Sequence, residues 1–287
     1  KHEVQSTSFE KAESTVRKHL IPYFQAIPLD KITTYDIDQL YAQKLQAGLA
    51  NATVKIMHNI LSKAFQKALK WGLIQKNPVV DTTPPSIKKK RKQIWSVEEA
   101  KTFLEVCEQE DYLIPFLLAL FTGMRRGEIL ALRWKNVDLN KSVIHVEESL
   151  ARTKADGLFV KEVKTSHSER DVFLSPSLRE ALATYKLQQD EHPMNLVFPS
   201  KNGTYLEPRN LLRKYKLLIK KAKVPYIPFH NLRHTHATIL MRMGENPKVV
   251  SERLGHARVG ITLDIYSHTN EEMQKKTAER FDDNFWT

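Results

Sequence analysis

Residues 112–128 read YLIPFLLALFTGMRRGE, an apolar run followed by Thr-Gly-Met, two arginines, a glycine and a glutamate. The run from Tyr112 to Phe121 predicts a helix, and Thr122-Gly123 must end or bend it. Glu128 lies three residues after Arg125, so both side chains share one helical face and the carboxylate can hold the guanidinium in position. This stretch therefore predicts a helix that delivers a fixed cation at its end.

The sequence around this stretch predicts a mostly helical lobe with one small sheet. Ser96-Val97-Glu98-Glu99 is a capping-box signature for a helix that reaches about Cys107. Three ranges alternate in polarity and contain β-branched residues, which predicts a small antiparallel sheet: 142–148, 158–164 and 170–174. Helices are expected to resume at Pro176, Pro208 and His230.

The first 80 residues predict helices only, because apolar residues recur there at helical spacing. One helix is expected from about Phe9 to Phe24, and a second follows a capping pair, Thr33 with Asp36, and stops near Gly48. A third helix carries a single apolar stripe, formed by Val54, Met57, Leu61, Ala64, Phe65 and Ala68. Its other face carries Lys55, Lys63, Lys67 and Lys70, which are either solvated or placed along a phosphate backbone.

Prolines and lysines separate this helical segment from the rest of the chain. Pro78, Pro84 and Pro85 disfavour helix, and the run from Lys88 to Lys92 consists of five cationic residues. We therefore expect a mainly α protein of two domains: a helical domain over 1–80, a basic linker over 81–93, and a mixed, mostly helical domain with a small antiparallel sheet over 94–287.

The composition favours nucleic acid as a partner. The formal net charge is +12 and the isoelectric point is about 9.5, so the chain attracts polyanions. Cys107 is the single cysteine, which excludes an internal disulfide and a cysteine-based zinc site and favours a reducing, intracellular setting. No apolar run approaches the ~18 residues of a membrane span. The sequence starts at Lys1, so a further segment before it is compatible with the sequence.

Four separate segments combine cations or hydrogen-bond donors with predicted turns. They are Thr122 to Glu128, Val163-Lys164-Thr165, His230-Asn231-Leu232-Arg233-His234, and Leu254-Gly255-His256, which Tyr266 follows ten residues later. In this order they resemble the signature of the tyrosine recombinase, or phage integrase, family, and the resemblance extends through the whole second lobe. The first lobe looks like the core-binding domain of that family.

The resemblance implies six catalytic residues: Arg125, Lys164, His230, Arg233, His256 and Tyr266. Convergent cations suit the reaction because a phosphodiester under attack gains negative charge on its non-bridging oxygens. Arginine offers bidentate bonds and keeps its charge, histidine transfers protons near neutral pH, and a lysine can protonate the departing 5′ oxygen. Tyr266 is the implied nucleophile, which needs cations and a base because its ordinary pKa is high.

Several assignments have competitors in the sequence. Arg126 competes with Arg125, and Lys154 and Lys161 compete with Lys164. His230 and His234 are spaced for a zinc site, but no glutamate of an H-E-x-x-H motif lies between them, so no metal or other cofactor is expected. His234, His236 and His268 are interpreted as structural residues.

The resemblance implies a site-specific recombinase that cleaves and rejoins double-stranded DNA through a 3′-phosphotyrosine, without ATP. It implies a homotetramer on two synapsed sites, an accessory DNA-bending or excision factor as a candidate partner, and a bacterial, cytoplasmic setting. Integrases of conjugative transposons and temperate phages are the most similar. The apolar residues after Tyr266, namely Met273, Phe281, Phe285 and Trp286, dock either on a neighbouring protomer or on their own core.

Two other functions stay open at the level of sequence. A type IB topoisomerase uses nearly the same chemistry but reseals its own cleaved strand as a monomer. A non-catalytic DNA-binding protein has no use for Tyr266. The target sequence, the crossover length and the direction of recombination depend on side chains that reach the DNA grooves, which the pattern does not place.

Overall fold

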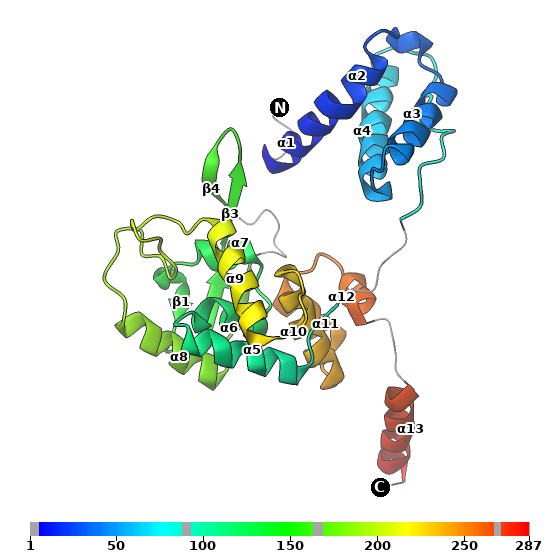
Figure 1. The fold of residues 1–287 in the computed structure, drawn as a ribbon. Coiled ribbons are helices and arrows are strands. Elements are labelled where there is room, and N and C mark those ends of the chain that lie inside the picture. Colours follow the sequence, from blue (N-terminus) through cyan, green and yellow to red (C-terminus); the bar gives the residue numbers. More distant parts are fainter. Residues whose placement is uncertain (1–5, 88–92, 163–168, 267–270, 287) are drawn as a thin grey trace. The chain divides into compact units, whose positions relative to one another are not determined.

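The computed structural model describes residues 6–87, 93–162, 169–266 and 271–286. The chain divides into two compact units (Figure 1). One comprises Lys1–Arg91 with Thr153–Gly157, and the other comprises Lys92–Arg152 with Leu158–Thr287. In the part of the chain that is described, no helix is both long and apolar enough to cross a membrane.

The first unit is built from helices, as the sequence predicted. They are α1 (Ser6–Thr15), a π-helical turn (Val16–Leu20), α2 (Ile21–Phe24), a 3-10 turn (Leu29–Lys31), α3 (Thr34–Gln46) and α4 (Asn51–Lys70). The capping box is confirmed, because the Thr33 backbone N–H donates to Asp36 Oδ2 at 2.8 Å and the Asp36 N–H donates to Thr33 Oγ1 at 3.3 Å.

The core of the first unit lies between α3 and α4. Ile37 and Leu40 of α3 and Val54 and Met57 of α4 are fully buried in it. The prediction of one apolar stripe on α4 was wrong for Ala64, which is exposed, because the buried face follows the larger side chains around it. The chain after α4 packs on the same core through Val79 and stays attached as far as Ser86, whose carbonyl accepts from Asn51 Nδ2 at 2.8 Å.

The second unit contains most of the helices. They are α5 (Val97–Gln109), α6 (Leu113–Thr122), α7 (Arg126–Ala131), a 3-10 turn (Trp134–Asn136), α8 (Pro176–Leu187), α9 (Pro208–Ala222), α10 (His230–Arg242), α11 (Pro247–Leu254), α12 (Val259–Tyr266) and α13 (Glu271–Phe285). The predicted capping box of Ser96 and Glu99 is present at the start of α5. The helix starts expected at Pro176, Pro208 and His230 are confirmed.

Aromatic rings fill the core of the second unit. Phe103 contacts Phe116 with ring centroids 5.2 Å apart, and Tyr215 lies 5.5 Å from both Phe116 and Phe229. Trp95 closes this core and ties the start of the unit to α10, because its backbone N–H donates to Thr235 Oγ1 at 3.2 Å. The helix that carries His230 and Arg233 is thereby held at its first turns.

Over the residues that the structure describes, the strands form two small sheets rather than the single sheet that was expected. β1 (Val137–Asp138), β2 (Val143–Val146) and β5 (Arg170–Phe173) make an antiparallel sheet of order β1-β2-β5, whereas β3 (Glu148–Thr153) pairs with β4 (Gly157–Glu162) as the hairpin seen in Figure 1. The chain leaves the first sheet at Glu147, where a carboxylate oxygen accepts from Asn136 Nδ2 at 2.6 Å. The alternating pattern of 142–148 continues across Glu147, so the sequence pattern did not reveal the break between the two sheets.

Helix packing brings the distant motifs of the second unit together. α10 packs against α6, α11 and α12, and α11 also contacts β5. Gly123 ends α6 in the left-handed region (φ +66°), and a Cβ at this position would collide with Leu254 and His236. The absence of a side chain at Gly123 therefore lets the ends of α6 and α11 approach α10 closely.

Candidate active site

Three arginines from different parts of the chain meet at the C-terminal end of α11. Arg170 Nε donates to the carbonyl of Arg253 at 2.8 Å, Arg233 Nη2 donates to that of Leu254, and Arg125 Nη2 donates to that of Gly255 at 2.8 Å. The three carbonyls are consecutive and lie at the negative end of the helix dipole, which attracts cations. The end of α11 thus gathers three guanidinium groups.

One buried carboxylate joins two of these arginines. Glu128 Oε1 accepts from Arg125 Nη1 at 2.6 Å, and its Oε2 accepts from the Arg125 backbone N–H at 2.8 Å and from Arg170 Nη2 at 2.9 Å. Burial by itself would raise the pKa of Glu128, but the hydrogen bond and charge of Arg170, followed by the charge of Arg125, lower it below its usual range. Glu128 is therefore ionised and fixes both guanidinium groups.

Arg233 lies beneath this pair and is 2% exposed. Its Nη1 donates to the carbonyl of Gly123 at 2.8 Å. Burial, followed by the positive charge of Arg125, lowers the pKa of Arg233 to about 9. Within the arginine group, formed by Arg125, Arg170, Arg233 and Glu128, positive charges outnumber the single negative charge, so the group attracts an anion.

Arg125, and not its neighbour Arg126, belongs to this group. Arg125 is the N-cap residue of α7 and has extended backbone angles, which turn its side chain towards Glu128 and Gly255. Arg126 begins the helix itself, and burial lowers its pKa. The side chain of Arg125 is 36% exposed, so it is accessible to a ligand as well as anchored.

His256 directly follows Gly255 at the end of α11, and its imidazole is neutral. Gly255 ends α11 in the left-handed region (φ +65°), and His256 Nδ1 lies 2.9 Å from Thr262 Oγ1 of α12. Burial, followed by the charges of Arg233 and Arg125, lowers the pKa of His256 to about 3. The structure therefore brings Arg125, Arg233 and His256 to one turn of the chain.

The histidines of α10 differ in their surroundings. His230 is exposed at the first position of the helix, and its ring centroid lies 4.8 Å from that of His234, which is buried. His236 Nδ1 lies 2.8 Å from the carbonyl of Leu120, while its Nε2 accepts from Arg253 Nε at 3.3 Å, so it holds α6 and α11 together. Among the residues described, no three or more His, Cys, Asp and Glu side chains are grouped so as to hold a metal ion.

Two of the six predicted residues are only partly accounted for. Lys164 lies in 163–168, outside the described residues, between the end of β4 and the start of β5. Tyr266 is the last residue of α12, which packs against α10 and α11, but its side chain is not among those described. The positions of these two side chains therefore stay predictions.

Arg170 is the member of the group that the sequence did not single out. It is the first residue of β5, and its side chain is 6% exposed. An arginine at the start of a predicted strand is usually solvated, and only its burial among residues from α7 and α11 shows otherwise. The one signal available was its position a few residues after the segment that holds Lys164.

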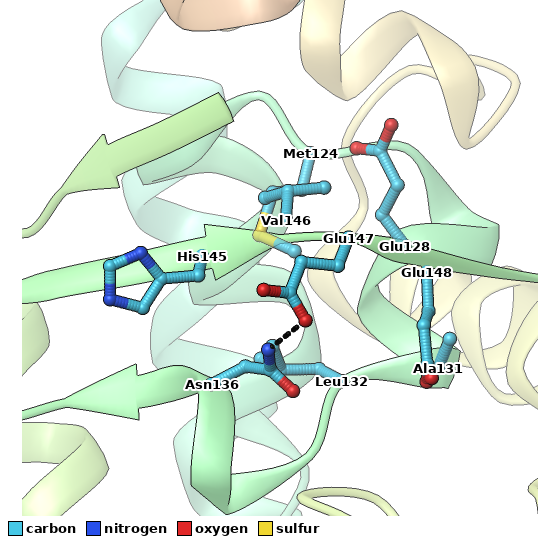
Figure 2. Close-up of a pocket in the computed structure, with 9 residues that line it drawn as sticks. All are labelled: Met124, Glu128, Ala131, Leu132, Asn136, His145, Val146, Glu147 and Glu148. Carbon is cyan, nitrogen blue, oxygen red and sulfur yellow. Dashed lines mark hydrogen bonds between the residues drawn. The ribbon is translucent and has the colours of Figure 1, made fainter. Parts of the chain in front are cut away.

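The space behind Glu128 is too small for a substrate. A cavity of about 10 Å³, roughly the room of one water molecule, lies between α7 and the strand β2. Figure 2 shows the Glu128 carboxylate directed away from Asn136 and Glu147, which bond to each other at 2.6 Å across this cavity. None of the three arginines lines this cavity.

Comparison with known proteins identifies the family of this chain. Residues 94–273 match the model described as the phage integrase family, and residues 1–46 match the phage integrase N-terminal SAM-like domain. The ICEBs1 integrase of Bacillus subtilis is 30% identical over 286 residues, which cover 96% of this chain and 77% of that protein.

Solved structures share the fold. The Tn1549 transposon integrase in complex with a circular intermediate DNA matches with a TM-score of 0.86 and 21% identity, over 97% of this chain and 95% of that one. A lambda integrase tetramer bound to a Holliday junction matches with a TM-score of 0.69 and 19% identity, over 91% of this chain and 72% of that one.

Proposed function

The chain belongs to the phage integrase family and is a site-specific tyrosine recombinase, and we propose that it cleaves and rejoins DNA at the arginines gathered on α11. The observation that carries this proposal is the convergence of Arg125 and Arg233 on adjacent carbonyls, beside the neutral imidazole of His256. Convergent cations stabilise the charge that develops on a phosphate under attack.

In this proposal Arg125 and Arg233 bind the non-bridging oxygens of the scissile phosphate. Arg125 is anchored through Glu128 and Gly255 while its side chain stays partly exposed, so it can meet the DNA without first reorganising. His256 supplies a hydrogen bond to the same phosphate, and its own Nδ1 is oriented by Thr262. A preorganised site of this kind stabilises the transition state more than the ground state.

Tyr266 is the proposed nucleophile, with His230 as the base and Lys164 as the acid. The phenol oxygen of Tyr266 forms a bond to phosphorus at the 3′ side, and the bond from phosphorus to the 5′ oxygen breaks. His230 accepts the phenol proton, and Lys164 donates a proton to the departing 5′ oxygen. A 5′-hydroxyl from a second duplex then reverses these steps, so the energy of the phosphodiester is conserved in the covalent link.

The remaining assignments concern DNA and assembly. We propose that residues 1–80 bind core DNA, that 81–93 link the two domains along the duplex, and that 94–287 perform strand exchange. The exposed face of α9 supports DNA contact in the second unit, since it carries the cations Arg209, Arg213, Lys216 and Lys220.

A homotetramer on two synapsed sites in the bacterial cytoplasm is the proposed active assembly, with an accessory DNA-bending or excision factor as a candidate partner. The lambda integrase tetramer on a Holliday junction supports this assembly by analogy of fold. The exposed side chains of Phe281 and Phe285 on α13, and of Trp286 directly after it, are proposed to dock on a neighbouring protomer.

Covalent capture on a nicked duplex tests the proposal. The duplex carries an end of the element, with a nick next to the cleavage site so that the released fragment diffuses away. The wild-type protein is expected to form a covalent complex that maps to Tyr266, whereas Tyr266→Phe binds the duplex without forming it. Covalent capture by Tyr266→Phe at the wild-type rate would disprove the assignment of the nucleophile.

A further inference from the structure

Arg170 has no assigned role, yet it occupies the centre of the arginine group. Its guanidinium makes a bidentate contact with Glu128, at 2.9 Å from Nη2 to Oε2 and 3.3 Å from Nη1 to Oε1, and its Nε donates to the carbonyl of Arg253. We propose that Arg170 is a positioning residue for strand cleavage, which sets Arg125 and the turn before His256 without contacting the phosphate. This inference rests on the proposed function of that site.

The first line of support is the shared carboxylate. Glu128 bonds to Arg125 on one side and to Arg170 on the other, and its side chain is 1% exposed. A carboxylate that bonds to two cations has its orientation fixed by both of them. Without the Arg170 guanidinium, Glu128 would be held by Arg125 alone, and the Arg125 guanidinium would keep its bond to the Gly255 carbonyl but lose a firmly oriented carboxylate partner.

The second line of support is the row of carbonyls. Arg170 holds the carbonyl of Arg253, which precedes the carbonyls that bind Arg233 and Arg125. Arg253 lies in the last turn of α11, so holding its carbonyl steadies the helix end that presents the carbonyls of Leu254 and Gly255. Arg170 therefore acts on both clamping arginines, through Glu128 and through the backbone of α11.

The third line of support is the origin of Arg170 in β5. This strand pairs with β2, and its register is fixed by the pairs of Val146 with Arg170 and Ile144 with Val172. The anchor point of Arg170 is therefore a sheet, which is more rigid than a loop.

The test compares Arg170→Lys with a matched control, Arg133→Lys. Arg133 lies in the same unit and makes the same kinds of contact, with Nε 3.1 Å from Glu148 Oε2 and Nη1 2.8 Å from the carbonyl of Met194. These partners lie outside α11. We expect both variants to bind a duplex of the element end as the wild type does, and Arg170→Lys to lower the single-turnover cleavage rate about tenfold or more relative to Arg133→Lys.

A second substrate separates positioning from general destabilisation. When a neutral methylphosphonate replaces the scissile phosphate, the charge that Arg125 faces is reduced, so misplacement of Arg125 matters less. The cleavage defect of Arg170→Lys is expected to shrink to about twofold on this substrate. An undiminished defect would overturn the proposal, because a merely unstable protein loses activity on both substrates alike.

Two further variants keep the outcomes distinct. Arg170→Gln retains an amide donor for Glu128 without the charge, and it is measured in the same way if Arg170→Lys melts at a lower temperature than Arg133→Lys. Arg125→Lys tests the site itself. If Arg125→Lys cleaves like the wild type, the proposed function of the arginine group is wrong. If Arg125→Lys is defective while Arg170→Lys and Arg170→Gln cleave like Arg133→Lys, only the positioning role of Arg170 is wrong.

Discussion

Arg125 and Arg233 donate to the carbonyls of adjacent residues, Gly255 and Leu254, although 108 positions of sequence separate the two arginines in the printed numbering. The distance between the two guanidinium groups is therefore set by one peptide unit at the end of α11. A rigid backbone template of this kind holds two cations together against their mutual repulsion, because the carbonyl dipoles compensate part of it. Changes that disturb this template should affect catalysis and stability together.

Glu128→Gln should destabilise the protein strongly. It removes the negative charge between Arg125 and Arg170 and leaves two partly buried cations without it, for which a loss of about 3–5 kcal/mol in the free energy of unfolding is expected. Urea unfolding measures this loss. Glu148→Gln is the control, since the Glu148 side chain is 28% exposed and pairs with Arg133; it should cost about 1 kcal/mol. Equal losses would contradict the central role of Glu128.

Gly123→Ala should be far more harmful than Gly157→Ala. Both glycines have positive φ, +66° and +67°, so both substitutions share a backbone cost of about 1–2 kcal/mol. A methyl group at Gly123 also meets Leu254 and His236, whereas no atom of the described residues lies within 4 Å of one at Gly157. Overpacking adds about 1–3 kcal/mol at Gly123. Thermal unfolding of the two variants checks this order, and a similar loss for both would show that the close approach is not tight.

Acid should destabilise the protein through two histidines, His236, which is buried, and His256, which is half-buried. Burial first, and then the charge of Arg253 at His236 and of Arg233 at His256, lower both pKa values to about 3. The unfolded chain binds these protons near its ordinary pKa of 6.5, so the free energy of unfolding falls as the pH drops from 6.5 towards 3 and is fully retained above 6.5. Denaturant titrations across this range measure the slope.

His236→Gln provides the control for that pH dependence. The glutamine amide can still donate to the carbonyl of Leu120, but it does not titrate. The variant should therefore lose less stability than the wild type between pH 6.5 and about pH 4. This range lies between the ordinary histidine pKa of 6.5 and the pKa of about 3 of His236 in the folded protein. An unchanged slope would mean that His236 is protonated in the folded protein.

Removing charges from α9 should weaken the salt dependence of DNA binding. Lys216 and Lys220 are exposed on one face of this helix, and removing a cation that neutralises one phosphate reduces the slope of log K against log salt by about 0.9. The double variant Lys216→Ala with Lys220→Ala should thus lower the slope by about 2, measured by fluorescence anisotropy. Lys214 and Lys221 pair with Glu110 and serve as the control pair; an equal change in both would locate the DNA elsewhere.

Local pattern was sufficient for most of the helical framework. The capping boxes of Thr33 and Ser96 and the helix end at Gly123 depend on residues a few positions apart, and the structure confirms all three. The break between β2 and β3 at Glu147 was not predictable in this way, because the alternation of side chains continues across it while the pairing partner changes.

By itself, the sequence determined the family and the identities of the candidate residues, because motif order and spacing survive in the chain as side-chain identities. Only the tertiary structure decided how they are held: which arginine bonds to which carbonyl of α11, and that Arg170 shares Glu128 across 42 positions. Backbone carbonyls are the same in every residue, so a site built on them leaves no mark in a motif. These carbonyls can bind the arginines only because helix packing places the end of α11 beside them.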